Sequence, residues 1–166
     1  VQQDALKRGI ETISRNLDRE VAKNKLSISE KSEAISRIVS TTDMGRLAES
    51  DFIVEAVIGE FGAKTKLFQS LDSTVGPNVV LASNTSSISI TKMASKTQKP
   101  DRVIGMHFMN PVPVMNLVEV VRGLATSDET CRVTKSLAES LGKTPVEVAD
   151  YPGFVSNRVL MPMINE

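Results

Sequence analysis

The sequence is short of the residue types on which several kinds of chemistry depend. Its 166 residues include one histidine, one cysteine and no tryptophan. A single cysteine excludes an internal disulfide and is compatible with a reducing compartment. A single histidine excludes a histidine-rich metal cluster, so we expect no metal site. Any acid–base chemistry by an imidazole must come from His107.

The chain also lacks an excess of charge of either sign. Lysine plus arginine and aspartate plus glutamate number 20 each. Without a basic field or a polybasic run, we expect neither nucleic acid nor a membrane as a partner. No apolar run approaches the ~20 residues that span a bilayer. Cys131 lies in a helical pattern, SDETCRVTKSLAESL, where packing is its expected role.

Both ends of the sequence look like interrupted helices. The chain opens on VQQDALKRGI without a capping residue and closes on VLMPMINE. We therefore expect an internal piece of a longer protein. A doubly wound sheet that lacked its central first strand would expose apolar edges, so we expect this piece alone to be poorly stable.

The first 39 residues predict a pair of helices. Apolar residues recur every three or four positions from Leu6 to Val21, which is the stripe of an amphipathic helix. Ser27 and Glu30 have the spacing of a capping box at the start of a second helix. The stretch IVSTT, residues 38–42, could form a short strand.

The middle of the chain alternates buried strands with helices. Strands are predicted at 51–58, 78–86, 101–108, 117–123 and 144–150. Helices are predicted at 63–75, 88–96 and 127–142, the last closed by Gly142. Continuous apolar strands between helices indicate an α/β fold with a mostly parallel, Rossmann-like sheet. A Pro-Gly break and an apolar helix at 150–166 suggest the start of a second domain, so residues 1–149 would form the first.

One expected feature of a dinucleotide-binding sheet is missing. No strand is followed by G-x-G-x-x-G, the loop that holds a pyrophosphate. The glycines of GEFGAK, residues 59–64, lack the third position of that motif.

Polar residues stand where parallel strands end, which is where such sheets bind ligands. After the predicted strands come Asn84, Thr85 and Ser86, then His107, then Asn110. Ser86 or Ser87 could instead cap a helix that begins at Ile88, and one loop can do both.

His107 is the candidate acid–base group. An isolated histidine is more often a satisfied structural residue, but this one ends a strand and precedes the proline-rich turn FMNPVP. Glu119 sits among apolar residues in the next strand, where an unpaired charge would be costly. A carboxylate on one ring nitrogen would fix the tautomer and make the other a stronger base. Asn157, on an apolar helix, needs polar partners too.

These stretches resemble one known family. LASNTSSISIT (81–91), HFMNPVPVMNLVEVV (107–121) and DYPGFVSNRVLMPMINE (150–166) are similar to the NAD-dependent L-3-hydroxyacyl-CoA dehydrogenases, in order and over nearly the whole chain. The resemblance implies a Rossmann-like NAD domain with a protruding helical pair and a helical C-terminal domain that forms a homodimer. It implies oxidation of the 3-hydroxyl of an acyl-CoA to a ketone in fatty acid β-oxidation.

The resemblance also implies roles for six residues. His107 resembles the catalytic base, Glu119 its carboxylate partner, and Ser86 and Asn157 the groups on the substrate oxygen. Lys64, Asn110 and again Ser86 match positions that contact NAD.

Two features leave alternatives open. Gly59 stands where relatives have an acidic residue near the cofactor, and the pyrophosphate loop would precede residue 1. A related dehydrogenase of a sugar acid or other hydroxy acid, or a non-catalytic paralogue acting as a structural module, would share many of these residues.

Overall fold

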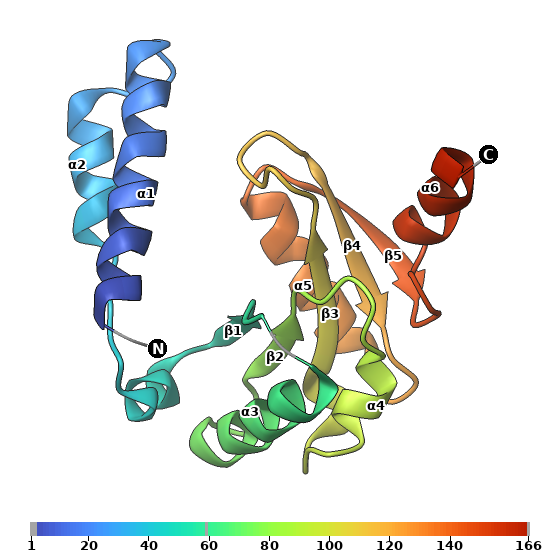
Figure 1. The fold of residues 1–166 in the computed structure, drawn as a ribbon. Coiled ribbons are helices and arrows are strands. Elements are labelled where there is room, and N and C mark those ends of the chain that lie inside the picture. The colour runs from blue at the N-terminus through green and yellow to red at the C-terminus, as the bar shows by residue number, and fades with distance from the viewer. Residues whose placement is uncertain (1–2, 59, 166) are drawn as a thin grey trace. The chain divides into compact units, whose positions relative to one another are not determined.

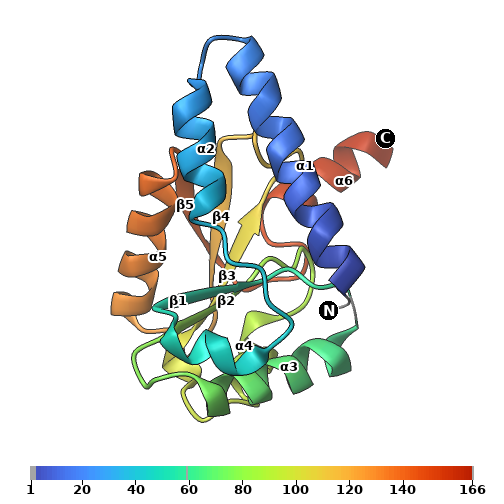
Figure 2. The same cartoon turned by 90° about the vertical axis from the view of Figure 1, so that its left-hand side faces the viewer.

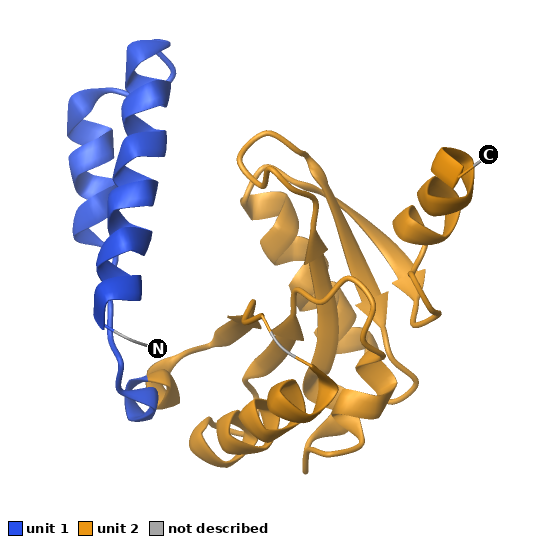
Figure 3. Ribbon diagram, in the orientation of Figure 1, with its two compact units in different colours: residues 1–46 blue, residues 47–166 orange. Residues whose placement is uncertain are grey.

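A computed structural model of the chain describes residues 3–58 and 60–165. The chain divides into two compact units, Val1–Arg46 and Leu47–Glu166 (Figure 3). The predicted boundary between residues 149 and 150 lies inside the second unit and stays a prediction.

The first unit is the predicted helical pair. It consists of α1, Gln3–Ala22, and α2, Ile28–Ser36. The capping box is confirmed: Ser27 accepts a hydrogen bond from the Glu30 amide, and the Glu30 carboxylate accepts one from the Ser27 amide at 2.8 Å. The helices are further joined by an ion pair between Lys31 and Asp18 at 2.5 Å. The capping box and the ion pair thus both stabilise helices that bury little apolar surface.

The possible strand at 38–42 is wrong. These residues have no regular structure, and a 3-10 helix, Met44–Glu49, follows them. A strand needs a neighbouring ladder, and within 3–58 and 60–165 no strand pairs with this segment.

The second unit contains the predicted sheet (Figure 1). Its strands are β1 Phe52–Glu55, β2 Val80–Ser83, β3 Val103–Phe108, β4 Leu117–Arg122 and β5 Thr144–Ala149. They lie in the order β1-β2-β3-β4-β5. Every pairing is parallel except that of β3 with β4, which is antiparallel. The mostly parallel sheet is therefore confirmed, with one reversal at the strands that matter most for the site.

Four helices accompany the sheet: α3 Phe61–Thr74, α4 Ile90–Ala94, α5 Asp128–Ser140 and α6 Ser156–Asn165. Gly142 closes α5 in the left-handed region, with φ of 71°. The expected cap at Ser86 or Ser87 is wrong. Helix α4 begins two residues later, and Ser89 accepts the hydrogen bond from the Lys92 amide.

Helices α3 and α4 cover one face of the sheet and α5 covers the other (Figures 1 and 2). Neighbouring residues along a strand point to opposite faces, so Leu81 packs with α3 and α4, and Ala82 packs with α5. In β3, Val103 faces α3 and α4 while Ile104 faces α5. By the same alternation His107 lies on the α3 and α4 face.

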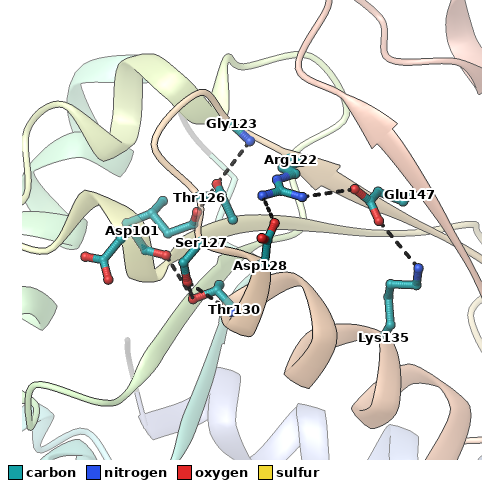
Figure 4. A network of polar contacts seen from close by, with 10 residues as sticks. Asp101, Arg122, Gly123, Thr126, Ser127, Asp128, Thr130, Lys135 and Glu147 are labelled. Atoms are coloured by element: carbon teal, nitrogen blue, oxygen red, sulfur yellow. Dashed lines mark hydrogen bonds and ion pairs between the residues drawn. The ribbon is translucent and has the colours of Figure 1, made fainter.

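The end of β4 is tied to the start of α5 by a polar network (Figure 4). Arg122 pairs with Asp128 and, at 3.4 Å, with Glu147. Thr126 donates a hydrogen bond to the Val103 carbonyl at 2.7 Å. These contacts fix the reversal between strand and helix at the end of β4 that lies away from His107.

Among the described residues, no helix combines the length and apolarity needed to cross a bilayer.

Candidate active site

The antiparallel pairing of β3 with β4 places His107 directly opposite Glu119. The Nδ1 atom of His107 and Oε2 of Glu119 are 2.8 Å apart. His107 is 8% exposed and Glu119 is 2% exposed. The expectation that the carboxylate would return beside the histidine is met, and the cause is the cross-strand register.

The other ring nitrogen of His107 faces the surface. All fully buried side-chain nitrogen and oxygen atoms of the described residues have hydrogen-bond partners. Nε2 has none among them, so it must be in contact with solvent. With Nδ1 held by a carboxylate, Nε2 carries the lone pair and can accept a proton.

Glu119 is held in place from a second side. Its Oε1 atom accepts hydrogen bonds from the amides of Val155 and Ser156, at 3.1 and 2.8 Å. Burial raises the pKa of this carboxyl, but the Ser156 amide, the His107 ring and the Val155 amide lower it more, and the net shift is downward. The carboxylate is therefore charged at neutral pH, and the amides at the start of α6 stabilise it.

Phe154 completes the packing around the histidine. Its ring meets that of His107 edge to face, with centroids 5.8 Å apart, and its side chain is 2% exposed. Its backbone is left-handed, with φ of 51°, next to Gly153 at 76°. This tight bend turns Val155 and Ser156 toward Glu119. Sequence reasoning missed Phe154, for which the Pro-Gly break was the available signal.

Ser86 and Asn157 also come together. The Nδ2 atom of Asn157 donates a hydrogen bond to the Ser86 carbonyl at 3.2 Å. The Ser86 hydroxyl lies on the exposed loop after β2. The backbone amide of Ser156 binds Glu119, and Asn157 is the next residue. Four predicted residues therefore belong to one connected site: His107, Glu119, Ser86 and Asn157.

Lys64 lines a cavity at the carboxyl ends of β1 and β2. The cavity has a volume of about 300 Å³, and its lining includes Val57, Lys64, Asn84 and Ser86. Lys64 pairs with Glu55 at 2.5 Å. Sequence reasoning missed Glu55, although a carboxylate in the middle of the apolar run FIVEAVI required a partner.

The remaining polar residues at strand ends divide into structural and unpartnered groups. Asn84 accepts a hydrogen bond from the Phe108 amide at 2.9 Å, and Thr85 accepts one from the Ile88 amide at 3.1 Å. Within the part of the chain that the structure describes, no hydrogen bond joins the side chain of Asn110 to the other candidates. Gly59 lies outside the described residues. No group of three His, Cys, Asp or Glu residues that could hold a metal occurs among the described residues.

Several known proteins are similar to this chain over nearly its whole length. A family model described as "3-hydroxyacyl-CoA dehydrogenase, NAD binding domain" matches residues 1–151. A probable 3-hydroxybutyryl-CoA dehydrogenase from Bacillus subtilis is 50% identical over the whole chain, which spans 58% of that relative. A 3-hydroxybutyryl-CoA dehydrogenase from Bradyrhizobium diazoefficiens is 45% identical over the whole chain and is covered to 57%.

Solved structures show the same likeness. The crystal structure of (S)-3-hydroxybutyryl-CoA dehydrogenase from Ralstonia eutropha superposes with a TM-score of 0.97 at 47% identity, over 99% of this chain and 58% of that one. The 3-hydroxybutyryl-CoA dehydrogenase from Escherichia coli gives 0.95 at 41% identity, over 98% of this chain and 34% of that one. The chain thus spans a little over half the length of the curated relatives described above.

Proposed function

The chain belongs to the 3-hydroxyacyl-CoA dehydrogenase family, and on this premise we propose that its protein oxidises the 3-hydroxyl of a 3-hydroxyacyl-CoA to the ketone with NAD. The substrate class includes 3-hydroxybutyryl-CoA, and the reaction belongs to fatty acid oxidation. The single observation that carries the proposal is the buried contact of His107 with Glu119, which leaves Nε2 open to solvent.

His107 acts as the general base. Nδ1–H donates a hydrogen bond to Oε2 of Glu119, so Nε2 can take the proton of the substrate hydroxyl. The imidazolium that forms is balanced by the carboxylate 2.8 Å away. Glu119 stays charged because the amides of Val155 and Ser156 hold its other oxygen. The pair therefore supports proton removal without placing an isolated charge in the interior.

Ser86 and Asn157 bind the oxygen on which charge develops. The hydroxyl and the amide approach the site from the β2 loop and from the start of α6, and the bond from Nδ2 to the Ser86 carbonyl fixes their separation. Donors fixed before the reaction stabilise the developing oxygen charge without reorganisation.

The donors around the 300 Å³ cavity suit the nicotinamide half of NAD. Lys64, Asn84, Thr85 and the Ser86 hydroxyl surround it, together with backbone at the end of β1. These are ligands for ribose hydroxyls and a carboxamide, and bound NAD would supply the acceptor for the hydride that leaves C3. Asn110, one strand end away, is assigned to the same cofactor by position.

The proposal extends to the rest of the protein. We assign an acyl-CoA as substrate and a homodimer formed through a helical C-terminal domain, both on the strength of the family. Size-exclusion chromatography with light scattering on the full-length protein tests the dimer, and a monomer at all concentrations would contradict it.

The activity is tested by measuring NADH formation by the full-length protein. NAD is supplied with 3-hydroxybutyryl-CoA in one assay and with gulonate in a matched assay. Turnover of the CoA ester supports the proposal. Turnover of gulonate alone would replace it with the sugar acid reading, and turnover of neither would favour a structural module.

A further inference from the structure

Glu55 and Lys64 form a buried ion pair that the proposed proton transfer does not use. Glu55 is 4% exposed and Lys64 is 5% exposed. The distance from Nζ to Oε1 is 2.5 Å. Removing a charged pair from water costs free energy. A buried pair therefore needs enough hydrogen bonds to offset this desolvation, or it serves a function that outweighs the cost. The carboxylate ends β1 and the ammonium comes from the first turns of α3.

Of the two residues, Lys64 lines the cavity that Ser86 also lines, and Glu55 contacts Lys64 and Val57 in its wall. Lys64 also donates to the Val57 carbonyl at 2.7 Å, and Glu55 accepts from the Val57 amide at 2.6 Å. The other carboxylate oxygen accepts a hydrogen bond from Ser83 at 2.7 Å. Both peptide groups of Val57 are thus fixed where β1 ends and the cavity begins.

Two of the three N–H groups of the ammonium are used by Glu55 and Val57. The third is available to a molecule in the cavity that Lys64 lines. Glu55 therefore holds the ammonium in place at the wall of the cavity and at the same time balances its charge.

The charge balance has a consequence for a nicotinamide ligand. The oxidised ring carries a positive charge and the reduced ring carries none. A lone ammonium beside the ring would disfavour the oxidised form, whereas a neutral pair treats the two forms more evenly. The lysine can then supply a hydrogen bond to the cofactor without repelling its oxidised ring.

We propose that Glu55 is a positioning residue that, through Lys64, sets the relative affinity of the site for the oxidised and reduced nicotinamide cofactor. The inference rests on the proposed function, since it requires the nicotinamide half of NAD in this cavity. It differs from a purely structural role for the pair, which would stabilise the fold without distinguishing the two redox forms.

The test is calorimetric titration of the full-length protein with NAD⁺ and, separately, with NADH. The variants are Glu55→Gln, Lys64→Gln and the double variant. The control is Glu129→Gln, which removes the carboxylate of an exposed pair with Arg132 on α5. The quantity compared is the ratio of the dissociation constant for NAD⁺ to that for NADH.

Glu55→Gln leaves a net positive charge, so the ratio rises roughly tenfold, the effect of one charge at an intermediate effective dielectric. Lys64→Gln leaves a net negative charge, so the ratio falls by a similar factor. The double variant returns the ratio to that of the wild type, and the control leaves it unchanged.

Opposite shifts in the two single variants support the inference, and each variant is decisive if the other does not fold. Equal changes in both dissociation constants, or no change, would overturn it while NAD binding stands. A wild-type protein that binds neither form would overturn the proposed function and this inference with it.

Discussion

Replacing Glu119 with glutamine tests the coupling between the histidine and the start of α6. The carboxylate accepts three hydrogen bonds, from Nδ1 of His107 and from the amides of Val155 and Ser156. An amide side chain has one oxygen and one NH₂ group, so it cannot accept from both sides. If its oxygen keeps the two backbone amides, its NH₂ group faces Nδ1.

That orientation forces the wrong tautomer on His107. Nδ1 must then accept a hydrogen bond, so the proton moves to Nε2 and the base is lost. A comparable carboxylate-to-amide change in another enzyme lowers turnover about 10⁴-fold for this reason. We expect Glu119→Gln to lower kcat by about 10³–10⁴-fold. In the opposite orientation two buried amides lose their acceptor, at a cost of about 1–3 kcal/mol of stability.

The pH dependence of the free energy of unfolding shows how much of the effect of Glu119→Gln comes from the lost charge of the carboxylate. The pKa of Glu119 is lowered because its hydrogen bonds outweigh the effect of burial. A carboxyl with a lowered folded-state pKa stabilises the fold above the ordinary glutamate pKa, and this stabilisation is lost as the pH falls through its folded value. The stability gap between wild type and Glu119→Gln should therefore narrow in acid.

The assays are NADH formation by the full-length protein and urea unfolding at neutral and acidic pH. Glu129→Gln, which changes an exposed carboxylate on α5, is the control. A Glu119→Gln enzyme with wild-type turnover would refute the tautomer argument. A stability gap that stays constant or widens in acid would refute the charge argument.

Three further predictions test the packing and capping of the fold. Asp150→Ala removes the carboxylate that accepts three hydrogen bonds at the start of α4 and should cost about 1–2 kcal/mol in urea unfolding, with Asp150→Asn closer to wild type; equal, negligible losses would contradict this. Gly105→Ala places a Cβ 2.7 Å from that of Val121 and should cost about 1–3 kcal/mol, whereas Gly62→Ala meets nothing within 4 Å and should be neutral or stabilising. Burial and Glu147 raise the pKa of the Cys131 thiol to about 11, so iodoacetamide should modify it slowly in the folded protein and rapidly in urea; equal rates would contradict this burial.

Much of the fold follows from local pattern. Continuous apolar runs predicted all five strands, and Gly142 closes α5 as expected. The segment 38–42 was the exception, because β propensity alone cannot supply a ladder partner. The start of α4 was also misplaced, since part of its cap comes from Asp150, about 60 residues further along the chain.

The residues of the candidate site were predictable from the sequence, but the hydrogen bonds that connect them were not. The likeness to the family pointed to His107, Glu119, Ser86 and Asn157, and the register of β3 against β4 explains why the first two meet. No local sequence pattern predicts that the backbone amides after Phe154 donate hydrogen bonds to Glu119, because the contact joins residues more than 30 positions apart. The pairing of Lys64 with Glu55 was not predicted either: the apolar run around Glu55 indicates that its carboxylate needs a partner but does not identify Lys64 as that partner.

The central claim is that His107 is the base, and His107→Gln in the full-length protein tests it most directly. Turnover of 3-hydroxybutyryl-CoA and the dissociation constant for NADH are measured on the same preparation. The account predicts a loss of turnover of about 10²–10⁴-fold with NADH affinity nearly unchanged, because the ring takes the proton and is not needed to hold the cofactor. Unchanged turnover, with folding and binding intact, would contradict it.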